Sequence, residues 1–370
     1  MRLTGGAVFT PEGFFLRELC FENGRIVPQC GGETLDVSGC YVIPGLTDLH
    51  FHGCMGADFS DADPDGLSRM AAYTLSRGVT QICPAGMTLA PEQLRKVCAT
   101  AAAYRGGGSW LCGVNLEGPF LSAAKKGAQN AAWLLPPDLA LLRELQSASG
   151  GLVRLVTVAP ELPGAETFIR EASKTVTVSL GHTAADYDTA AAAFSAGARQ
   201  VTHLFNAMPS LGHRAPGVVG AAFDCPGCMV ELICDGIHIH PSVVRAVFRL
   251  FGPERVLLIS DTMRAAGMPD GEYTLGGLPV RVRGARAELE DGIIAGSVTD
   301  LMAGLCHAVS FGIPLEDAVQ AAACNPARVL GIAEQVGTLE PGKLANLAVL
   351  DRSMRLRHVF FHGQPVTVRP

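Results

Sequence analysis

Residues 42–53 read VIPGLTDLHFHG, in which an apolar run of strand length, Val42–Leu49, is followed by two histidines. A strand that is apolar along its whole length is typical of a parallel sheet covered on both faces. Residues two apart in a strand point to the same side, so His50 and His52 project together just beyond this strand. The stretch therefore predicts a buried strand with a pair of imidazoles at its carboxyl end.

Seven more apolar runs of this kind follow, separated by helix-like stretches. With the first, the predicted strands are Val42–Leu49, Val79–Pro84, Trp110–Leu116, Val153–Ala159, Val176–Leu180, Gln200–His203, Val230–Cys234 and Val256–Ser260. Eight strand–helix units in about 290 residues match the size of a (β/α)8, TIM-like barrel, so we expect the α/β class. The alternative is a doubly wound open sheet, but the glycine-rich phosphate loops that would favour it, G-x-G-x-x-G or G-x-x-x-x-G-K-[ST], do not occur in the sequence.

Both ends of the chain differ from this middle part. The first 44 residues alternate short apolar runs with turns, of which Asn23-Gly24 is the strongest hairpin signal. The last residues contain a similar strand-like run, Leu344–Leu350. We therefore expect residues 1–44 and 335–370 to form one small β-sandwich domain, and residues 45–334 to form the metal-dependent catalytic barrel.

The composition excludes several classes of protein. Hydrophobic residues make up 48% of the 370 residues and charged residues 17%, with a net charge of −6. These values exclude a disordered chain and argue against nucleic-acid binding, which needs a basic face. We find neither a signal peptide nor an apolar run of ~18 residues that could cross a membrane. We therefore expect a cytoplasmic protein with no membrane partner.

The 12 cysteines are spread along the chain, and in a protein without an export signal we expect them to be mostly reduced and buried. Two of them form the C-x-x-C sequence Cys225-Pro226-Gly227-Cys228. Pro-Gly marks a turn, which is our interpretation of this pair. A redox pair or half of a zinc site are the alternatives.

Polar residues follow the ends of other predicted strands. Glu117 follows the third strand, His182 the fifth and His203 ends the sixth. The carboxyl ends of barrel strands meet at one rim, where active sites lie. A single histidine near a strand end is usually structural. The joint pattern with His50 and His52 nevertheless predicts a metal site, because imidazole and carboxylate ligands suit zinc, iron or similar divalent ions.

Asp261 follows the eighth predicted strand and should lie at the mouth of the same rim. A carboxylate beside a metal-activated water can take its proton and later pass it to a leaving group. The structural alternative is an aspartate that caps a following helix. We favour the catalytic role.

Loops after the strands suggest an anionic substrate. Arg214 and His238 lie on predicted loops at the barrel mouth, where an arginine could clamp a phosphate through two hydrogen bonds. A solvated loop charge explains Arg214 equally well. The segment Lys125–Asn130 is a second polar loop above the barrel, and its lysines are equally compatible with solvation.

These motifs resemble the amidohydrolase superfamily, and within it the family of deacetylases that act on N-acetylglucosamine 6-phosphate. The resemblance runs nearly end to end. The segments that carry it are Pro44–Gly53, Leu116–Phe120, Ala159–Glu161, Leu180–Thr183, Thr202–Met208, Asp235–His238, Ser260–Met263, Ile294–Ser297 and Asn325–Ala327.

The resemblance implies that Glu117, His182 and His203 bind the principal metal, and that Asp261 acts as general base and then as general acid. Because this chain keeps His50 and His52, it implies one or two divalent ions per subunit, zinc or iron, with manganese or cobalt as alternatives. It also implies a homodimer with His238 near the interface. The residues expected to contact the sugar phosphate are Ala128, Gln129, Asn206, Ala207, Arg214, His238, Ile294, Ala295 and Gly296.

The implied reaction converts N-acetylglucosamine 6-phosphate to glucosamine 6-phosphate and acetate. One alternative is a hydrolase of cyclic amides from the same superfamily. Such enzymes use a carboxylated lysine at the end of strand four, where this chain has Val158-Ala159-Pro160. The other alternative is a non-catalytic barrel, for which we would expect broken ligands; all six candidate residues are present.

Overall fold

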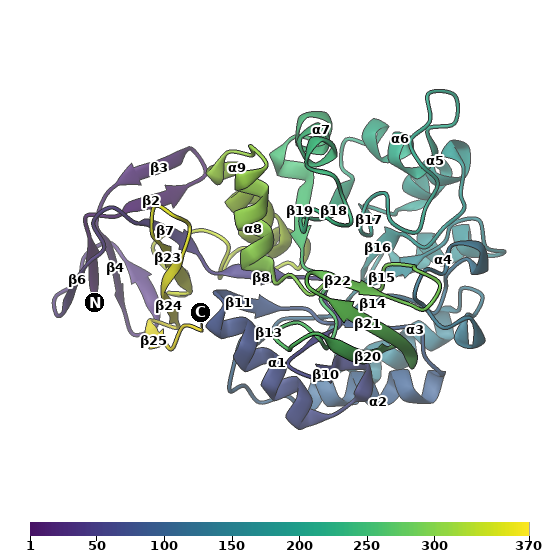
Figure 1. Cartoon of the computed structure of the whole chain (residues 1–370), viewed down its shortest axis with the longest axis horizontal. Coiled ribbons are helices and arrows are strands. Elements are labelled where there is room, and N and C mark those ends of the chain that lie inside the picture. Colours follow the sequence, from purple (N-terminus) through teal and green to yellow (C-terminus); the bar gives the residue numbers. More distant parts are fainter. Residues whose placement is uncertain (370) are drawn as a thin grey trace.

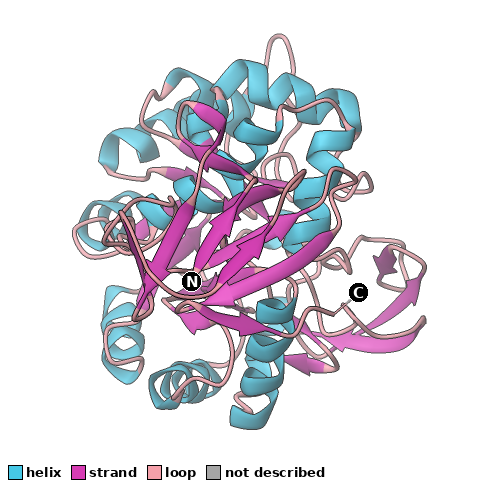
Figure 2. Ribbon diagram, turned by 90° about the vertical axis from the view of Figure 1, so that its left-hand side faces the viewer, coloured by secondary structure: helices cyan, strands magenta, loops and turns pink. Residues whose placement is uncertain are grey.

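The computed structural model describes residues 1–369. Strands from both ends of the chain lie together on the left of Figure 1, and strands mixed with helices form the larger part on the right. Figure 2 views the molecule from the side of the terminal strands, with helices around the strands of the larger part. None of the helices in the described chain is long and apolar enough to cross a bilayer.

The larger part is built on parallel strands. One sheet has three, in the order β13 (Trp110–Leu111), β11 (Val79–Ile82) and β8 (Leu46–Asp48). The other has seven, in the order β12 (Ala85–Gly86), β14 (Val114–Leu116), β15 (Val153–Val158), β16 (Thr177–Leu180), β17 (Gln200–Val201), β18 (Met229–Ile233) and β19 (Val256–Ile259). The predicted parallel α/β architecture is therefore confirmed, and the strands lie in chain order.

The first predicted strand was wrong in one respect, because it is two strands. β7 (Tyr41–Pro44) pairs with strands of the terminal sheet, whereas β8 joins the parallel sheet after a break at Gly45. A Cβ on Gly45 would lie 2.1 Å from Oγ1 of Thr80. Only glycine fits this crossing, so Gly45 marks the change from one sheet to the other.

Helices follow the strands and bury the outer strand faces. They are α1 (Pro64–Ser76), α2 (Pro91–Ala103), α3 (Leu139–Ala148), α4 (Ala165–Ala172), α5 (Tyr187–Ala196), α6 (Gly217–Asp224), α7 (Pro241–Phe251), α8 (Leu301–Ser310), α9 (Leu315–Val319) and α10 (Asn325–Val329). Side chains of Asp63, Asp138, Asp186 and Asp300 cap α1, α3, α5 and α8 by accepting hydrogen bonds from main-chain N–H groups of the first turn.

Both faces of the parallel strands are buried. On β15, Val156 packs in the cluster formed with the surrounding helices, while Leu155 packs with Leu257 and Leu330 in a separate cluster. This explains why these strands read as continuous apolar runs rather than alternating ones. It also leaves the strand ends as the places where polar side chains can meet.

Strands from both termini share one sheet. Its order is β25 (Gln364–Val366), β24 (Leu356–Phe361), β23 (Leu347–Leu350), β7, β2 (Ala7–Thr10) and β3 (Gly13–Leu16). A second sheet has the order β5 (Arg25–Val27), β4 (Leu19–Glu22), β1 (Arg2–Thr4) and β6 (Thr34–Asp36). Asn23 and Gly24 join β4 to β5 with positive φ at both residues, so the predicted Asn-Gly hairpin is confirmed.

A three-stranded antiparallel sheet was not predicted. It consists of β20 (Gly271–Leu275), β21 (Leu278–Arg283) and β22 (Arg286–Glu288), and it lies between β19 and α8 in the chain. Its turn, Gly276-Gly277, and the alternating pattern of β21 are signals that would have revealed it. The predicted turn at Cys225–Cys228 is confirmed, since the N–H of Cys228 donates to the carbonyl of Cys225 and both thiols are free.

Candidate metal centre and substrate cavity

Three polar side chains that follow different strands meet at one end of the parallel sheet. They are Glu117 after β14, His182 after β16 and His203 after β17, and we call them the Glu117 triad. Oε1 of Glu117 lies 3.0 Å from Nε2 of His182 and 2.9 Å from Nε2 of His203. The two Nε2 atoms are 3.1 Å apart. All three side chains are buried.

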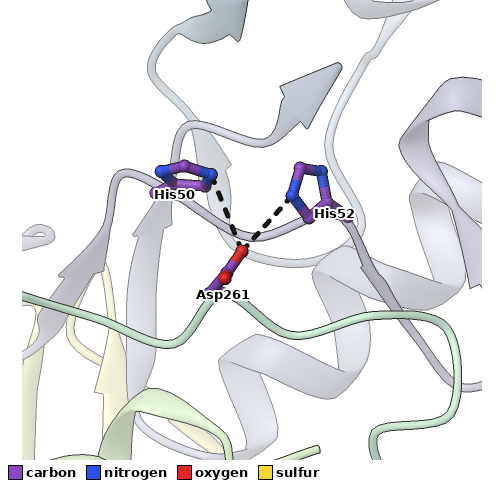
Figure 3. Close-up of side chains that lie close together, drawn as sticks. All are labelled: His50, His52 and Asp261. Atoms are coloured by element: carbon purple, nitrogen blue, oxygen red, sulfur yellow. Dashed lines mark ion pairs between the residues drawn. The ribbon is translucent and has the colours of Figure 1, made fainter. Parts of the chain in front are cut away.

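A second group lies beside the first and consists of His50, His52 and Asp261, which we call the Asp261 triad. Figure 3 shows both imidazoles directed at one carboxylate oxygen of Asp261. That oxygen, Oδ1, is 3.7 Å from Nε2 of His50 and 3.3 Å from Nε2 of His52. The predicted projection of the two histidines to one side brings them to the same carboxylate.

Glu117 connects the two triads. Its Oε1 is also 3.4 Å from Nε2 of His50, and its Oε2 is 3.2 Å from Nε2 of His52. One carboxylate therefore lies within 3.4 Å of four imidazole nitrogens. This is the arrangement expected of a carboxylate that bridges two cations.

The backbone is strained at three of these residues. His182, His203 and Asp261 have φ of 47°, 28° and 50°, a region that non-glycine residues seldom adopt. Neighbouring main-chain groups hold Asp261 in place, because its N–H donates to the carbonyl of His50 and its own carbonyl accepts from the N–H of Ser297. Strain of this kind is found where surrounding structure fixes side chains for function.

The charges of the two triads are strongly coupled. Burial lowers the pKa of His52, but the nearby carboxylates of Asp261 and Glu117 raise it to about 10. Burial likewise opposes protonation of His50, whose pKa Glu231 and Glu117 hold well above its usual value. Burial raises the pKa of Glu117, yet nearby imidazoles, His50 first, lower it well below its usual range. The site therefore favours positive charge, which a divalent cation would supply.

Three imidazoles are oriented with Nε2 toward the centre. Nδ1 of His182 donates to the carbonyl of Lys125 at 3.0 Å, and Nδ1 of His52 donates to the carbonyl of Ala85 at 3.1 Å. Nδ1 of His50 faces Glu231 at 2.9 Å. Carbonyl and carboxylate oxygens accept hydrogen bonds, so Nδ1 of each ring carries a proton. In a neutral ring the lone pair is then on Nε2, as in metal-binding histidines.

The donor set fits a divalent ion. Within the described chain, Nε2 of His50 and Oδ1 of Asp261 are buried and have no hydrogen-bond partner, which is costly unless another group completes them. Ligands at 2.0–2.1 Å in a tetrahedral site lie about 3.3 Å apart, close to the separations found here. Imidazole and carboxylate donors suit zinc and iron, and they also accept manganese or cobalt.

A cavity of about 480 Å³ opens over the two triads. Of the residues expected to contact substrate, the following line it: Ala128, Gln129, Asn206, Ala207, His238, Ile294 and Gly296. Arg214 is exposed and does not line this cavity, and Ala295 is buried in an apolar cluster beside it. His238 lines the cavity of its own chain.

His238 is held by a neighbouring carboxylate. Oδ2 of Asp235 lies 2.6 Å from Nδ1 of His238, and Oδ1 accepts hydrogen bonds from the N–H groups of Ile237 and His238. Burial raises the pKa of Asp235, but the hydrogen bond to His238 leads the effects that bring it below its usual value. The ionised carboxylate fixes the imidazole, whose Nε2 is left for a ligand.

Gln129 has a different environment from the one we expected. Its Nε2 donates to Oε2 of Glu117 at 2.5 Å, and its Oε1 accepts from the N–H of Thr88 at 2.8 Å. The amide thus orients the carboxylate that the two triads share. Both of its polar atoms are engaged within the protein, although the residue also lines the cavity.

Sequence reasoning missed several residues around the site. Arg286 and Leu275 reach the cavity from the unpredicted β20–β22 sheet. The periodicity of that sheet was the available signal. Glu231, a fully buried carboxylate behind His50, was also missed. Its signal was a single acidic residue inside the apolar run of β18.

Comparisons with known proteins agree with this geometry. Residues 41–368 match the model of the amidohydrolase family. The chain is 37% identical to the N-acetylglucosamine-6-phosphate deacetylase of Bacillus subtilis over 84% of this chain and 80% of that protein. It is 36% identical to the N-acetylgalactosamine-6-phosphate deacetylase of Escherichia coli O157:H7, over 87% and 86% of the two chains.

Solved structures give the same result. The structure of an aspartate-to-alanine variant of the Mycobacterium smegmatis N-acetyl-D-glucosamine-6-phosphate deacetylase, in complex with N-acetyl-D-glucosamine-6-phosphate, superposes with a TM-score of 0.93 at 34% identity. The match covers 100% of this chain and 99% of the other. By sequence and by fold, the chain belongs to the amidohydrolase family.

Proposed function

We propose that this chain is a metal-dependent hydrolase that removes the acetyl group from N-acetyl-D-glucosamine 6-phosphate, giving D-glucosamine 6-phosphate and acetate. The observation that carries the proposal is the meeting of Glu117, His182 and His203 with Asp261 at the base of a cavity in a deacetylase-like chain. The cavity is large enough for a sugar phosphate, which is a small ligand.

In this proposal Glu117, His182 and His203 hold one divalent ion, zinc or iron, and His50, His52 and Asp261 hold a second. When bound, the ion would polarise the acetamide carbonyl and lower the pKa of a water molecule. Asp261 has a lowered pKa, because its contact with the His52 imidazole at 3.3 Å and the nearby charge of His50 outweigh burial. It is therefore ionised and able to act as a base.

Asp261 then performs two proton transfers. As the water oxygen attacks the carbonyl carbon, a carboxylate oxygen of Asp261 accepts the water proton. The carbon–nitrogen bond of the tetrahedral intermediate breaks when protonated Asp261 donates that proton to the amine nitrogen. The acetyl group leaves as acetate with the water oxygen, and the sugar keeps the amine.

The remaining lining residues would bind the sugar phosphate. We assign Ala128, Asn206, Ala207, Ile294 and Gly296 to the sugar or its phosphate because they surround the cavity above Asp261. His238, fixed by Asp235, would hold an anionic group. Arg214 stays a prediction from the sequence, as does the homodimer.

We also propose that the parallel strands close into a (β/α)8 barrel, with residues 1–44 and 335–370 as a small β-sandwich domain. The hydrogen bond from the N–H of Asp261 to the carbonyl of His50 joins the segment after β19 to the segment after β8 and supports closure. An apolar cluster that contains Leu3, Phe21 and Phe360 supports a terminal domain with its own core. A cytoplasmic location stays a prediction.

The test is an assay of acetate release with the metal varied. The protein is stripped of metal, reloaded separately with zinc, iron, manganese or cobalt, and given N-acetylglucosamine 6-phosphate, N-acetylgalactosamine 6-phosphate or unphosphorylated N-acetylglucosamine. We expect metal-dependent turnover, fastest with N-acetylglucosamine 6-phosphate. Faster turnover of the galactosamine isomer would reassign the substrate, and no turnover with any metal would refute the proposal.

A further inference from the structure

Glu231 is a carboxylate with no access to solvent. It lies on β18, where its neighbours Val230 and Leu232 are apolar, and its exposed fraction is 0%. A buried charge of this kind is expensive unless it is fully hydrogen-bonded. Glu231 does not line the substrate cavity, so contact with substrate cannot account for its presence.

Both oxygens of Glu231 are engaged, and two of the three partners belong to the triads. Oε2 is 2.9 Å from Nδ1 of His50 and accepts a hydrogen bond from the main-chain N–H of His203 at 3.0 Å. Oε1 accepts from Nε2 of Gln200 at 2.6 Å. The carboxylate therefore touches one residue of each triad from behind.

The contact with His50 decides which ring nitrogen faces the site. Because the carboxylate accepts a hydrogen bond from Nδ1–H, Nε2 is directed away from Glu231, toward Glu117 at 3.4 Å and Asp261 at 3.7 Å. Within residues 1–369 this Nε2 has no hydrogen-bond partner. A carboxylate behind a metal-binding histidine fixes the ring and makes it a stronger donor.

The contact of Glu231 with His203 should affect the metal site less than its contact with His50. It fixes only the main chain, at a residue whose φ is 28°. The imidazole of His203 is held by other groups, since its Nε2 lies 2.9 Å from Glu117 and 3.1 Å from Nε2 of His182. Changing the charge of Glu231 should therefore act on the Asp261 triad more than on the Glu117 triad.

We propose that Glu231 is a positioning residue that determines whether the Asp261 triad holds a divalent ion, by keeping Nε2 of His50 directed into that triad. This rests on the proposed function only in assuming that the two triads bind metal. It predicts that the two ions can be separated, with the Glu117 triad keeping its ion when Glu231 is neutralised.

The test variant is Glu231→Gln, which keeps the shape of the side chain. The introduced amide oxygen can still accept from His50. The introduced NH2 group, which faces Nε2 of Gln200, can donate to Oε1 of Gln200 once that amide turns over, and this oxygen has no hydrogen-bond partner within the described chain. The variant should therefore fold. Glu231→Leu removes the hydrogen bond as well as the charge. Thr47→Val is the control, because Thr47 is equally buried and its hydroxyl bonds Gln81, which belongs to neither triad.

The readout is zinc binding to metal-free protein with no substrate present. It is measured by calorimetric titration and by elemental analysis after dialysis. We expect two equivalents for the native chain and for Thr47→Val. For Glu231→Gln we expect one equivalent at native affinity and a second weakened about 10- to 100-fold, the usual effect of losing such a partner. The Leu variant should weaken the second equivalent at least as much.

Three results would overturn the proposal: native affinity for both equivalents in Glu231→Gln, equal weakening of both, or a native chain that binds one ion only. The last result would leave the proposed function intact if that single-ion protein still released acetate from N-acetylglucosamine 6-phosphate. Absence of any zinc binding in the native chain would overturn both. The thermal unfolding midpoint of each variant, measured alongside, shows that a change in binding is not a loss of fold.

Discussion

The two triads are built from similar residues but are held in different ways. The Glu117 triad takes its members from the ends of three strands, β14, β16 and β17, and its donor atoms lie 2.9–3.1 Å apart. The Asp261 triad takes His50 and His52 from one segment after β8, and they lie 3.3–3.7 Å from Asp261. The first is a compact cluster, and the second is more open.

The Asp261 triad depends on a residue of the Glu117 triad, but the Glu117 triad does not depend on Asp261. Glu117 is within 3.4 Å of the histidines of both triads. Among the ion pairs of residues 1–369, the carboxylate of Asp261 pairs only with the two histidines of its own triad. Loss of Glu117 should therefore disturb both triads, and loss of Asp261 should disturb one. Variants of Glu117 should therefore report on metal binding, and variants of Asp261 on proton transfer.

The largest effect is expected for Glu117→Gln. Removing the shared carboxylate charge should weaken binding of both ions and lower kcat/KM at least about 10³-fold, since the ion supplies several kcal/mol to the transition state. Zinc content and acetate release measure the two effects. Glu144→Gln is the control, because Glu144 is exposed and pairs with Arg95, which belongs to neither triad. Retention of both ions in Glu117→Gln would contradict the shared role.

Asp261→Asn should have the next largest effect. The amide cannot accept a proton, so kcat should fall at least about 10²-fold, the usual size of a general acid–base contribution. The Glu117 triad should keep its ion, which elemental analysis would show. Asp63→Asn, at the exposed cap of α1, is the matched control. Near-normal turnover of Asp261→Asn would remove Asp261 from the proton transfers.

Gln129→Leu tests the Glu117 triad, as Glu231→Gln tests the Asp261 triad. It removes the hydrogen bond to Oε2 of Glu117 without changing charge, so metal affinity should fall about 10- to 100-fold. In contrast to Glu231→Gln, this loss should include the ion of the Glu117 triad. Competition with a zinc chelator measures it. If affinity is unchanged and only KM rises, Gln129 is a substrate contact and does not orient Glu117.

The smallest effect on turnover is expected for the cavity residue that would bind phosphate. His238→Asn should raise KM for N-acetylglucosamine 6-phosphate about tenfold or more, because a hydrogen bond to a charged group contributes about 1.5–3 kcal/mol. KM for unphosphorylated N-acetylglucosamine should change little. Equal increases for both sugars would exclude the changed residue from the phosphate site.

Much of the fold and of the site could be predicted because it depends on local patterns. The buried strands read as apolar runs since both of their faces pack, and a histidine or glutamate just after such a run must lie near the rim. That reasoning placed His50, His52, Glu117, His182 and His203 together. The positions of these residues directly after predicted strands were enough for that prediction, because parallel strands bring their carboxyl ends to one edge.

The remainder depends on contacts that have no local signature. Gly45, between β7 and β8, must be glycine because Thr80, far along the chain, leaves no space for a side chain. Glu231 reads as one acidic residue in an apolar strand, and only the fold places it behind His50. Arg214 reads as an anion ligand by composition, yet it is exposed outside the cavity of its own chain.

The most direct measurement is anomalous diffraction from crystals of the protein loaded with zinc, recorded on both sides of the zinc absorption edge. We predict a strong peak about 2.0–2.2 Å from the nearest donor atoms of Glu117, His182 and His203. A zinc-loaded crystal with no anomalous peak among these three residues, or with its peak elsewhere in the molecule, would contradict the account.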